Sequence, residues 1–97
     1  MILFKVCLLV NQWSIDKSNF EISVAVDSSG YVYVADGGNN RIQKFFNDGT
    51  FITKWGKYGT CEGEFNYPSS LAVDSFTDVY VADSGNGRIQ VFAPSFG

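Results

Sequence analysis

The residues of this 97-residue chain that are most able to take part in chemistry are two acid–arginine pairs with the same spacing. Asp36 stands five positions before Arg41, and Asp83 stands five positions before Arg88. A carboxylate beside a guanidinium could bind an ionic ligand. At a turn, however, the carboxylate can also accept hydrogen bonds from backbone amides while the arginine bridges to it across a hairpin. Because both pairs occur at turn positions, we interpret them as hairpin architecture.

Other polar residues near turns receive the same structural interpretation. Asp27 and Asp74 each end a short apolar stretch, where loop carboxylates sometimes bind cations, but no acidic cluster has the spacing of a calcium loop. Asn40 and Asn86 belong to the repeated turns, and we assign both asparagines to the repeat motif. The run that begins at Gly85 starts like a phosphate-binding loop, but it lacks the third glycine and precedes a strand pattern rather than a helix.

Three aromatic residues are the candidates for contact with a ligand. Trp55, Tyr58 and Tyr67 could form an exposed platform, or they could pack as core between layers of structure. The sequence itself leaves both interpretations open.

Several classes of chemistry lack the residues that they need. The chain has no histidine, which excludes an imidazole base, a Ser-His-Asp triad and a His-ligated zinc ion within it. Cys7 and Cys61 are too few for a disulfide framework or a metal site, so we expect thiols and no cofactor. The net charge of −3 and the scattered lysines argue against nucleic-acid and membrane partners.

The elements that must position these residues come from an internal repeat. Val24 to Phe45 reads VAVDSSGYVYVADGGNNRIQKF, and Leu71 to Phe92 reads LAVDSFTDVYVADSGNGRIQVF, at a constant offset of 47 positions. A period of this length indicates stacked structural units. The stretch YVYVA alternates aromatic and β-branched residues, which predicts a strand that is covered on both faces.

Each repeat is predicted to fold into short antiparallel strands joined by tight turns. In the first copy the expected strands cover 24–27, 31–35, 41–46 and 50–55, and Asp48-Gly49 is a strong hairpin signal. Four strands in a unit of about 47 residues, covered on both faces, are typical of a propeller blade. The fold class is therefore all-β.

The repeated residues resemble the NHL repeat. The resemblance rests on Ala-Val-Asp-Ser, then Val-Tyr-Val-Ala-Asp, then Asn-x-Arg-Ile-Gln-x-Phe and a closing Trp-Gly, and it covers Val24 to Phe92 well. It implies two blades of a β-propeller whose parent fold is usually six-bladed. The chain departs from the pattern at Glu21, where a proline is usual, and at Thr77-Asp78, where Gly-Asn is usual.

The expected organisation has four parts. Residues 1–14 form a degenerate outer strand of a preceding blade, 15–23 a connection, 24–56 the first repeat, and 57–97 a connecting loop with a second repeat that lacks its fourth strand. Residues 1–10 only partly resemble a signal segment, because Lys5 interrupts the apolar run and no cleavage site follows. The compartment stays open: we slightly favour the cytoplasm, and the protein would be secreted if residues 1–10 are a signal segment.

Two blades cannot close a ring, which leaves two hypotheses for the assembly. The chain is a fragment of a longer propeller, which we favour, or it forms a head-to-tail trimer in which the N-terminal strand of each copy completes the last blade of its neighbour. Either way the partners include further blades or a second copy.

We expect a non-catalytic scaffold that binds a protein or peptide across the loop end of the blades. The alternative class is a propeller enzyme of lyase or hydrolase type, whose active residues would lie in blades outside this sequence. The family also includes RNA-binding propellers of ubiquitin ligases, which the acidic balance of this chain disfavours.

Overall fold

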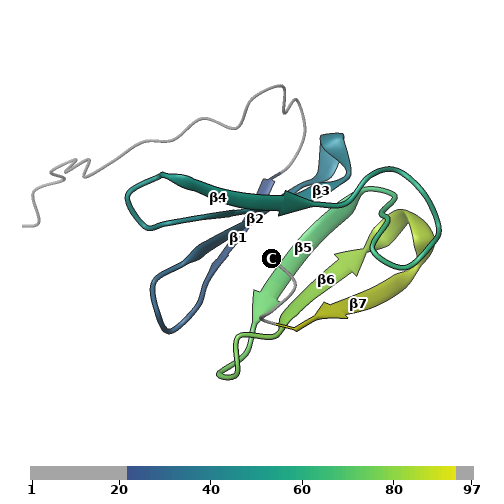
Figure 1. The fold of residues 1–97 in the computed structure, drawn as a ribbon. Coiled ribbons are helices and arrows are strands. Elements are labelled where there is room, and N and C mark those ends of the chain that lie inside the picture. The colour runs from purple at the N-terminus through teal and green to yellow at the C-terminus, as the bar shows by residue number, and fades with distance from the viewer. Residues whose placement is uncertain (1–21, 94–97) are drawn as a thin grey trace, which may run out of the picture.

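The computed structural model describes residues 22–93, which form two antiparallel β-sheets. The first sheet, called blade 1, has the order β1-β2-β3-β4, as Figure 1 shows. Its strands are β1 (Ile22–Val26), β2 (Val32–Asp36), β3 (Arg41–Phe45) and β4 (Phe51–Trp55). The expected strand in residues 1–14 and the residues beyond 93 lie outside the described part of the chain.

The second sheet, called blade 2, has three strands within residues 22–93. They are β5 (Pro68–Val73), β6 (Val79–Asp83) and β7 (Arg88–Phe92), in the order β5-β6-β7. β6 and β7 pair in the same register as β2 and β3 at an offset of 47 positions, so that Asp83 faces Arg88 as Asp36 faces Arg41. The expected all-β architecture of two partial propeller blades is confirmed.

Backbone pairing rather than residue type sets the strand ends. β1 begins at Ile22 rather than at Val24, because Ile22 pairs with Asp36 on the neighbouring strand. β3 ends at Phe45, where the pairing with β4 shifts its register, and the Phe46 amide bonds instead to the Thr50 carbonyl across the turn.

The turn after the first strand of each blade is built around a carboxylate. Asp27 accepts hydrogen bonds from the amides of Ser29 and Tyr31 and from the Tyr33 hydroxyl. Asp74 repeats these three bonds in blade 2, with the amides of Phe76 and Asp78 and the hydroxyl of Tyr80. The two aspartates therefore fix the hairpins, as an Asx turn does.

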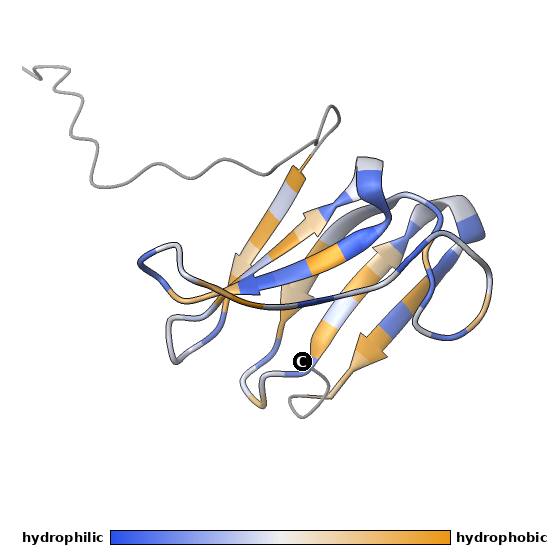
Figure 2. Cartoon of the chain, turned by 45° about the horizontal axis from the view of Figure 1, so that its top comes forward, coloured by the Kyte–Doolittle hydropathy of each residue, from blue (hydrophilic) through white to orange (hydrophobic). Residues whose placement is uncertain are grey.

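The blades pack face to face around one apolar core. β5 lies beside β1 and β2, which joins the two sheets (Figure 1). In Figure 2 hydrophobic residues concentrate on the strands and hydrophilic ones mostly on the turns. The buried core consists of Tyr33, Ala35, Ile42, Phe65, Leu71, Val79, Val81 and Phe92. β2 is buried at all five of its positions, as expected for a covered strand, whereas β6 alternates buried with more exposed residues.

Candidate functional site

The carboxylate of Asp36 lies in the turn between β2 and β3 and is completely buried. Its Oδ2 accepts hydrogen bonds from Arg41 Nε at 2.9 Å and from Asn39 Nδ2 at 3.1 Å. A short 3-10 turn, Gly37–Asn39, carries the chain between the two strands, and Asn40 closes it with a left-handed backbone at φ 52°. The arginine thus bridges the hairpin to the acid.

Blade 2 repeats this arrangement with more partners on the acid. Asp83 is completely buried and accepts hydrogen bonds from Arg88 Nε at 2.8 Å, Asn86 Nδ2 at 2.9 Å and the Asn66 amide at 2.7 Å. Burial raises the pKa of this carboxyl, but the hydrogen bonds from Asn86, Asn66 and Arg88 outweigh burial and hold the pKa below its ordinary value.

Arg88 is further occupied by the loop between β4 and β5. Its two terminal nitrogens donate to the carbonyl oxygens of Thr60, Cys61 and Glu64 at 2.8–3.0 Å. Four of the five N–H donors of the guanidinium thus bond to the protein itself, which favours a structural role over one in anion binding. Within residues 22–93 no group of three His, Cys, Asp or Glu side chains comes together to hold a metal ion.

The turn at Gly85 offers no phosphate cradle either. The Gly85 amide donates to the Asn66 carbonyl at 2.7 Å, and a Cβ at this position would lie 2.4 Å from that same oxygen. The glycine is required for close approach of two chain segments, not for a ligand.

A pocket at the loop end of the blades is the first candidate site. It has a volume of about 470 Å³ and lies between the turn of blade 1 and the loop that enters blade 2. Tyr58, whose surface is 71% exposed, forms part of its wall. Its lining consists of Gly37, Gly38, Asn40, Tyr58, Asn66 and Tyr67.

Tyr67 holds an unusual backbone conformation in this pocket. Its φ is 57°, in the left-handed region, which costs a bulky residue roughly 1–3 kcal/mol unless its surroundings enforce it. Asn40 Oδ1 accepts the Tyr67 amide at 2.7 Å and thereby ties the two turns together. The Tyr67 ring lies where a side chain at Gly37 would be, since a Cβ there would come within 2.8 Å of the ring.

Trp55 lies apart from the two tyrosines with which sequence reasoning grouped it. Its ring packs edge to face with Phe92 at a centroid distance of 5.5 Å, between the blades and next to the core. Of the three aromatic candidates, the structure brings together Tyr58 and Tyr67, while Trp55 takes the core position that was the alternative.

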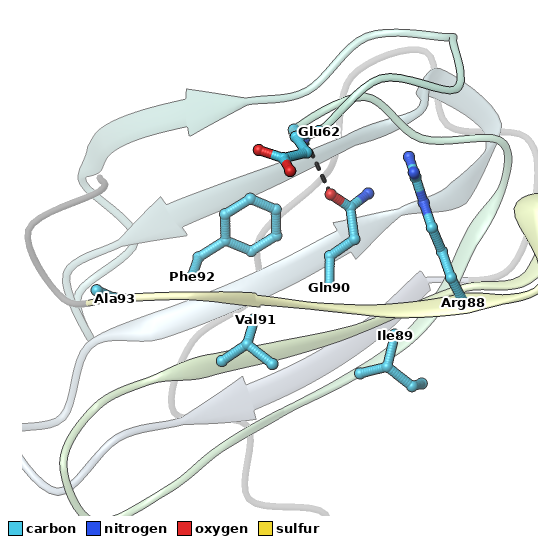
Figure 3. A pocket seen from close by; sticks show the side chains of 8 residues that line it. Glu62, Arg88, Ile89, Gln90, Val91, Phe92 and Ala93 are labelled. Atoms are coloured by element: carbon cyan, nitrogen blue, oxygen red, sulfur yellow. Dashed lines mark hydrogen bonds between the residues drawn. The ribbon is translucent and has the colours of Figure 1, made fainter.

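The free edge of β7 forms a second candidate site. Among the described residues no strand pairs with this edge, although the equivalent edge of β3 pairs with β4. A groove of about 820 Å³ follows the strand from Arg88 to Ala93. Figure 3 shows Arg88, Gln90 and Phe92 on one side of β7 and Ile89 and Val91 on the other.

Sequence reasoning missed residues that join the blades to their loops. Asn66 contributes both its amide, to Asp83, and its carbonyl, to Gly85. Gln90 donates to the Glu64 carbonyl at 2.7 Å and accepts the Gly63 amide at 2.9 Å, the bond drawn in Figure 3. The signal for Gln90 was present, because it repeats Gln43 at the same offset of 47 positions as the arginines.

Asn39, which the sequence analysis did not select, is the residue equivalent to Asn86, since both donate their side-chain amide to the buried aspartate of their blade. Asn40 stands at the position of Gly87, and both residues close their turns with a left-handed backbone.

The remaining features do not add chemistry to these sites. Cys61 is an exposed free thiol, and Cys7 lies outside the described residues. From Ile22 to Ala93 no helix is long and apolar enough to cross a bilayer.

Comparison with known proteins agrees with this geometry. A family model described as NHL repeat matches residues 22–45 and 65–92, which are two repeats and more than half of the chain. No curated protein matches the sequence. Protein binding is typical of this repeat, which acts as a scaffold. This chain, with two blades that each carry the repeated acid–arginine hairpin, belongs to the NHL repeat family.

Proposed function

We propose that this chain is a non-catalytic scaffold that binds a segment of another protein at the loop end of its blades. The observation that carries the proposal is the pocket between the turn of blade 1 and the loop that enters blade 2, which Tyr58 and Tyr67 line together with Gly37 and Gly38. Tyrosine is favoured in protein recognition, because its ring buries a large area at little entropic cost and its hydroxyl forms hydrogen bonds.

The chemistry of the surroundings supports binding rather than catalysis. The repeated charged groups are engaged with the protein itself, Asp36 with Arg41 and Asp83 with Arg88. The pocket wall offers an exposed ring and amide side chains, which suit a peptide backbone and its polar side chains. The net charge of −3 favours a neutral or basic segment over an acidic one.

Selection of peptides from a displayed library tests the proposal. Peptides enriched on the wild-type protein should bind Tyr58→Ala at least tenfold more weakly, because removal of a central aromatic contact costs about 1.4 kcal/mol or more. Phe76→Ala is the matched control, since Phe76 is also an exposed aromatic residue but lies at the β5–β6 turn. A library that yields no binder, or binders indifferent to Tyr58, would refute the loop-end site. Metal-dependent turnover of a peptide or a sugar lactone would favour the enzymatic alternative.

The edge of β7 supports a second mode of peptide binding, by addition of a strand. Backbone groups on a free edge can pair with an extended peptide, and the groove beside β7 provides room for its side chains. The sequence of β4, Phe51–Trp55, indicates what fits, because β4 pairs with the equivalent strand of blade 1.

A synthetic peptide of residues 49–57 is therefore the probe for this edge. It should bind the protein and shift the amide resonances of β7 in an NMR titration, while a peptide of the same composition in scrambled order should not. Equal shifts from both peptides would contradict strand addition, and this result would leave the test with Tyr58 unaffected.

A further inference from the structure

The contact between the two blades consists of two complementary faces. The inner face of blade 1 carries Ala25, Tyr33, Ala35 and Ile42, and it packs against the inner face of blade 2, which carries Leu71, Val79, Val81 and Phe92. β1 and β2 supply the strands on one side and β5 the nearest strand on the other. One interface of known composition is therefore present within a single chain.

The outer face of blade 2 repeats the inner face of blade 1. At an offset of 47 positions the residues are identical. The equivalents of Ala25, Tyr33, Ala35 and Ile42 are Ala72, Tyr80, Ala82 and Ile89. Tyr33 is 3% exposed and Tyr80 is 38% exposed, although the hydroxyl of each bonds to the aspartate of its own turn. The outer face of blade 2 is thus the same surface, and within residues 22–93 no second sheet packs on its tyrosine.

The outer face of blade 1 repeats the inner face of blade 2 in turn. Its residues are Val24, Val26, Val32, Val34 and Phe45, which stand for Leu71, Val73, Val79, Val81 and Phe92. Val24 and Val26 are among the most exposed large apolar residues of the described chain. Val32 and Val34 on the neighbouring strand are buried, so the exposed part of this face is its β1 side, which is equivalent to β5 of blade 2. Both halves of the internal interface therefore occur a second time, and the copy on blade 1 is exposed at Val24 and Val26.

We propose that the outer face of blade 2 binds the outer face of blade 1 of a second copy of this chain, reproducing between copies the packing found between the blades. The contact is heterologous, because two different faces meet, so copies add head to tail. A second copy is the occupant that the residues specify, since the complementary surface is present on the same chain. This contact does not depend on the proposed peptide-binding function.

The shape of the outer face of blade 2 agrees with this occupant. A hollow of about 170 Å³ lies among Leu71, Ala72, Tyr80, Ala82 and Ile89. In the proposed contact, Val24 of a second copy takes the place that Leu71 has in the internal interface. There the Leu71 side chain packs in the core against the inner face of blade 1. The small alanines leave room for that side chain, as they do inside the chain.

One position at which the two equivalent faces carry different residues provides a control. Lys44, at the side of the inner face of blade 1, holds its ammonium 5.4 Å from the centroid of the Tyr33 ring and 4.7 Å from that of Tyr31. Its equivalent in blade 2 is Val91, which is exposed. A lysine at position 91 would therefore restore a side chain that the internal interface already accommodates.

Sedimentation velocity over about 1 µM to 1 mM protein tests the contact. The wild type should associate as its concentration rises, and Ile89→Lys and Val24→Lys should each weaken this association at least tenfold, because each places a charge within an apolar contact. Val91→Lys should associate within about threefold of the wild type. Both blocked residues are exposed on strands, and circular dichroism verifies that the variants fold; Ala72→Glu and Val26→Lys replace any variant that does not.

Mixing the two blocked variants decides the geometry. Ile89→Lys retains an intact outer face on blade 1 and Val24→Lys an intact outer face on blade 2, so the mixture should form a one-to-one dimer that grows no further. In this dimer Tyr80 of the Val24→Lys chain should be protected from nitration by tetranitromethane, as we expect for Tyr33, which is 3% exposed.

Four results would overturn the proposal. The first two are a wild-type protein that stays monomeric throughout the concentration range and a mixture that stays monomeric. The third is association that Ile89→Lys abolishes while Val24→Lys leaves it intact, which would mean that blade 2 pairs with itself. The fourth is loss of association in Val91→Lys, which would show that the contact differs from the internal one.

Discussion

Ile42 and Ile89 form a matched pair of residues that measures what the packing between blades contributes. They occupy equivalent positions in β3 and β7, yet Ile42 is 0% exposed and Ile89 is 63% exposed. Ile42 lies in the core that joins the two sheets, whereas Ile89 lies on the outer face of blade 2. Truncation of each residue to alanine changes the same atoms in two different environments.

The expected magnitudes follow from the exposures. Truncation of isoleucine removes three carbon atoms, each worth about 0.8 kcal/mol when fully buried, so Ile42→Ala loses about 2.4 kcal/mol of transfer free energy. The cavity left behind brings the total loss of unfolding free energy to about 3–4 kcal/mol. Ile89 is only about one-third buried and leaves no cavity, so Ile89→Ala should cost less than about 1 kcal/mol.

Urea unfolding provides the assay. In a Trp13→Phe background the fluorescence reports on Trp55, which packs between the blades against Phe92. All variants should be measured at the same low protein concentration, because association between copies through the Ile89 face would stabilise the folded state by mass action. Equal losses of unfolding free energy for Ile42→Ala and Ile89→Ala would refute the account in which burial between blades, rather than strand propensity, holds this structure.

Two further predictions concern the loop that enters blade 2. Asp83→Asn should lower the unfolding free energy by about 3 kcal/mol at pH 7, because the buried carboxylate accepts bonds from Asn66, Asn86 and Arg88, whose donors would lose a charged acceptor. Burial raises the pKa of Asp83, but those hydrogen bonds lower it by more, so the folded pKa lies below the unfolded pKa of about 3.9. The stabilisation is therefore complete above about pH 3.9 and is lost as the pH falls through the folded pKa. A difference in unfolding free energy between wild type and Asp83→Asn that stays constant down to about pH 2 would contradict this. Gly85→Ala should cost about 1–3 kcal/mol in the same urea assay, because its Cβ would meet the Asn66 carbonyl, whereas Ser75→Ala at an exposed turn should cost less than about 0.5 kcal/mol; equal costs would show that the close approach at Gly85 is unimportant.

Much of the fold was predictable, because each repeat carries its structure in local patterns. Alternation in YVYVA, the turn residues and the constant offset of 47 positions specify strands and hairpins without knowledge of distant contacts. The pairing of Asp36 with Arg41 is equally local, since the two residues face one another across a single hairpin.

The candidate sites were less predictable, because they arise between segments far apart in the chain. Tyr67 meets Gly37 only because the loop entering blade 2 folds over the turn of blade 1, and Asn40 holds it there across 27 positions. Trp55 resembled Tyr58 in sequence as an aromatic residue near a loop. The packing of the sheets placed Trp55 against Phe92 and left Tyr58 in solvent.

The sequence alone determined that this protein is built from two equivalent blades, because periodicity and turn chemistry act over a few residues. Only the tertiary structure decided that equivalent residues have different environments. Burial depends on which sheet lies opposite, so identical isoleucines and tyrosines are core in blade 1 and surface in blade 2. That asymmetry, invisible in the repeat itself, is the physical basis for the proposed contact between copies.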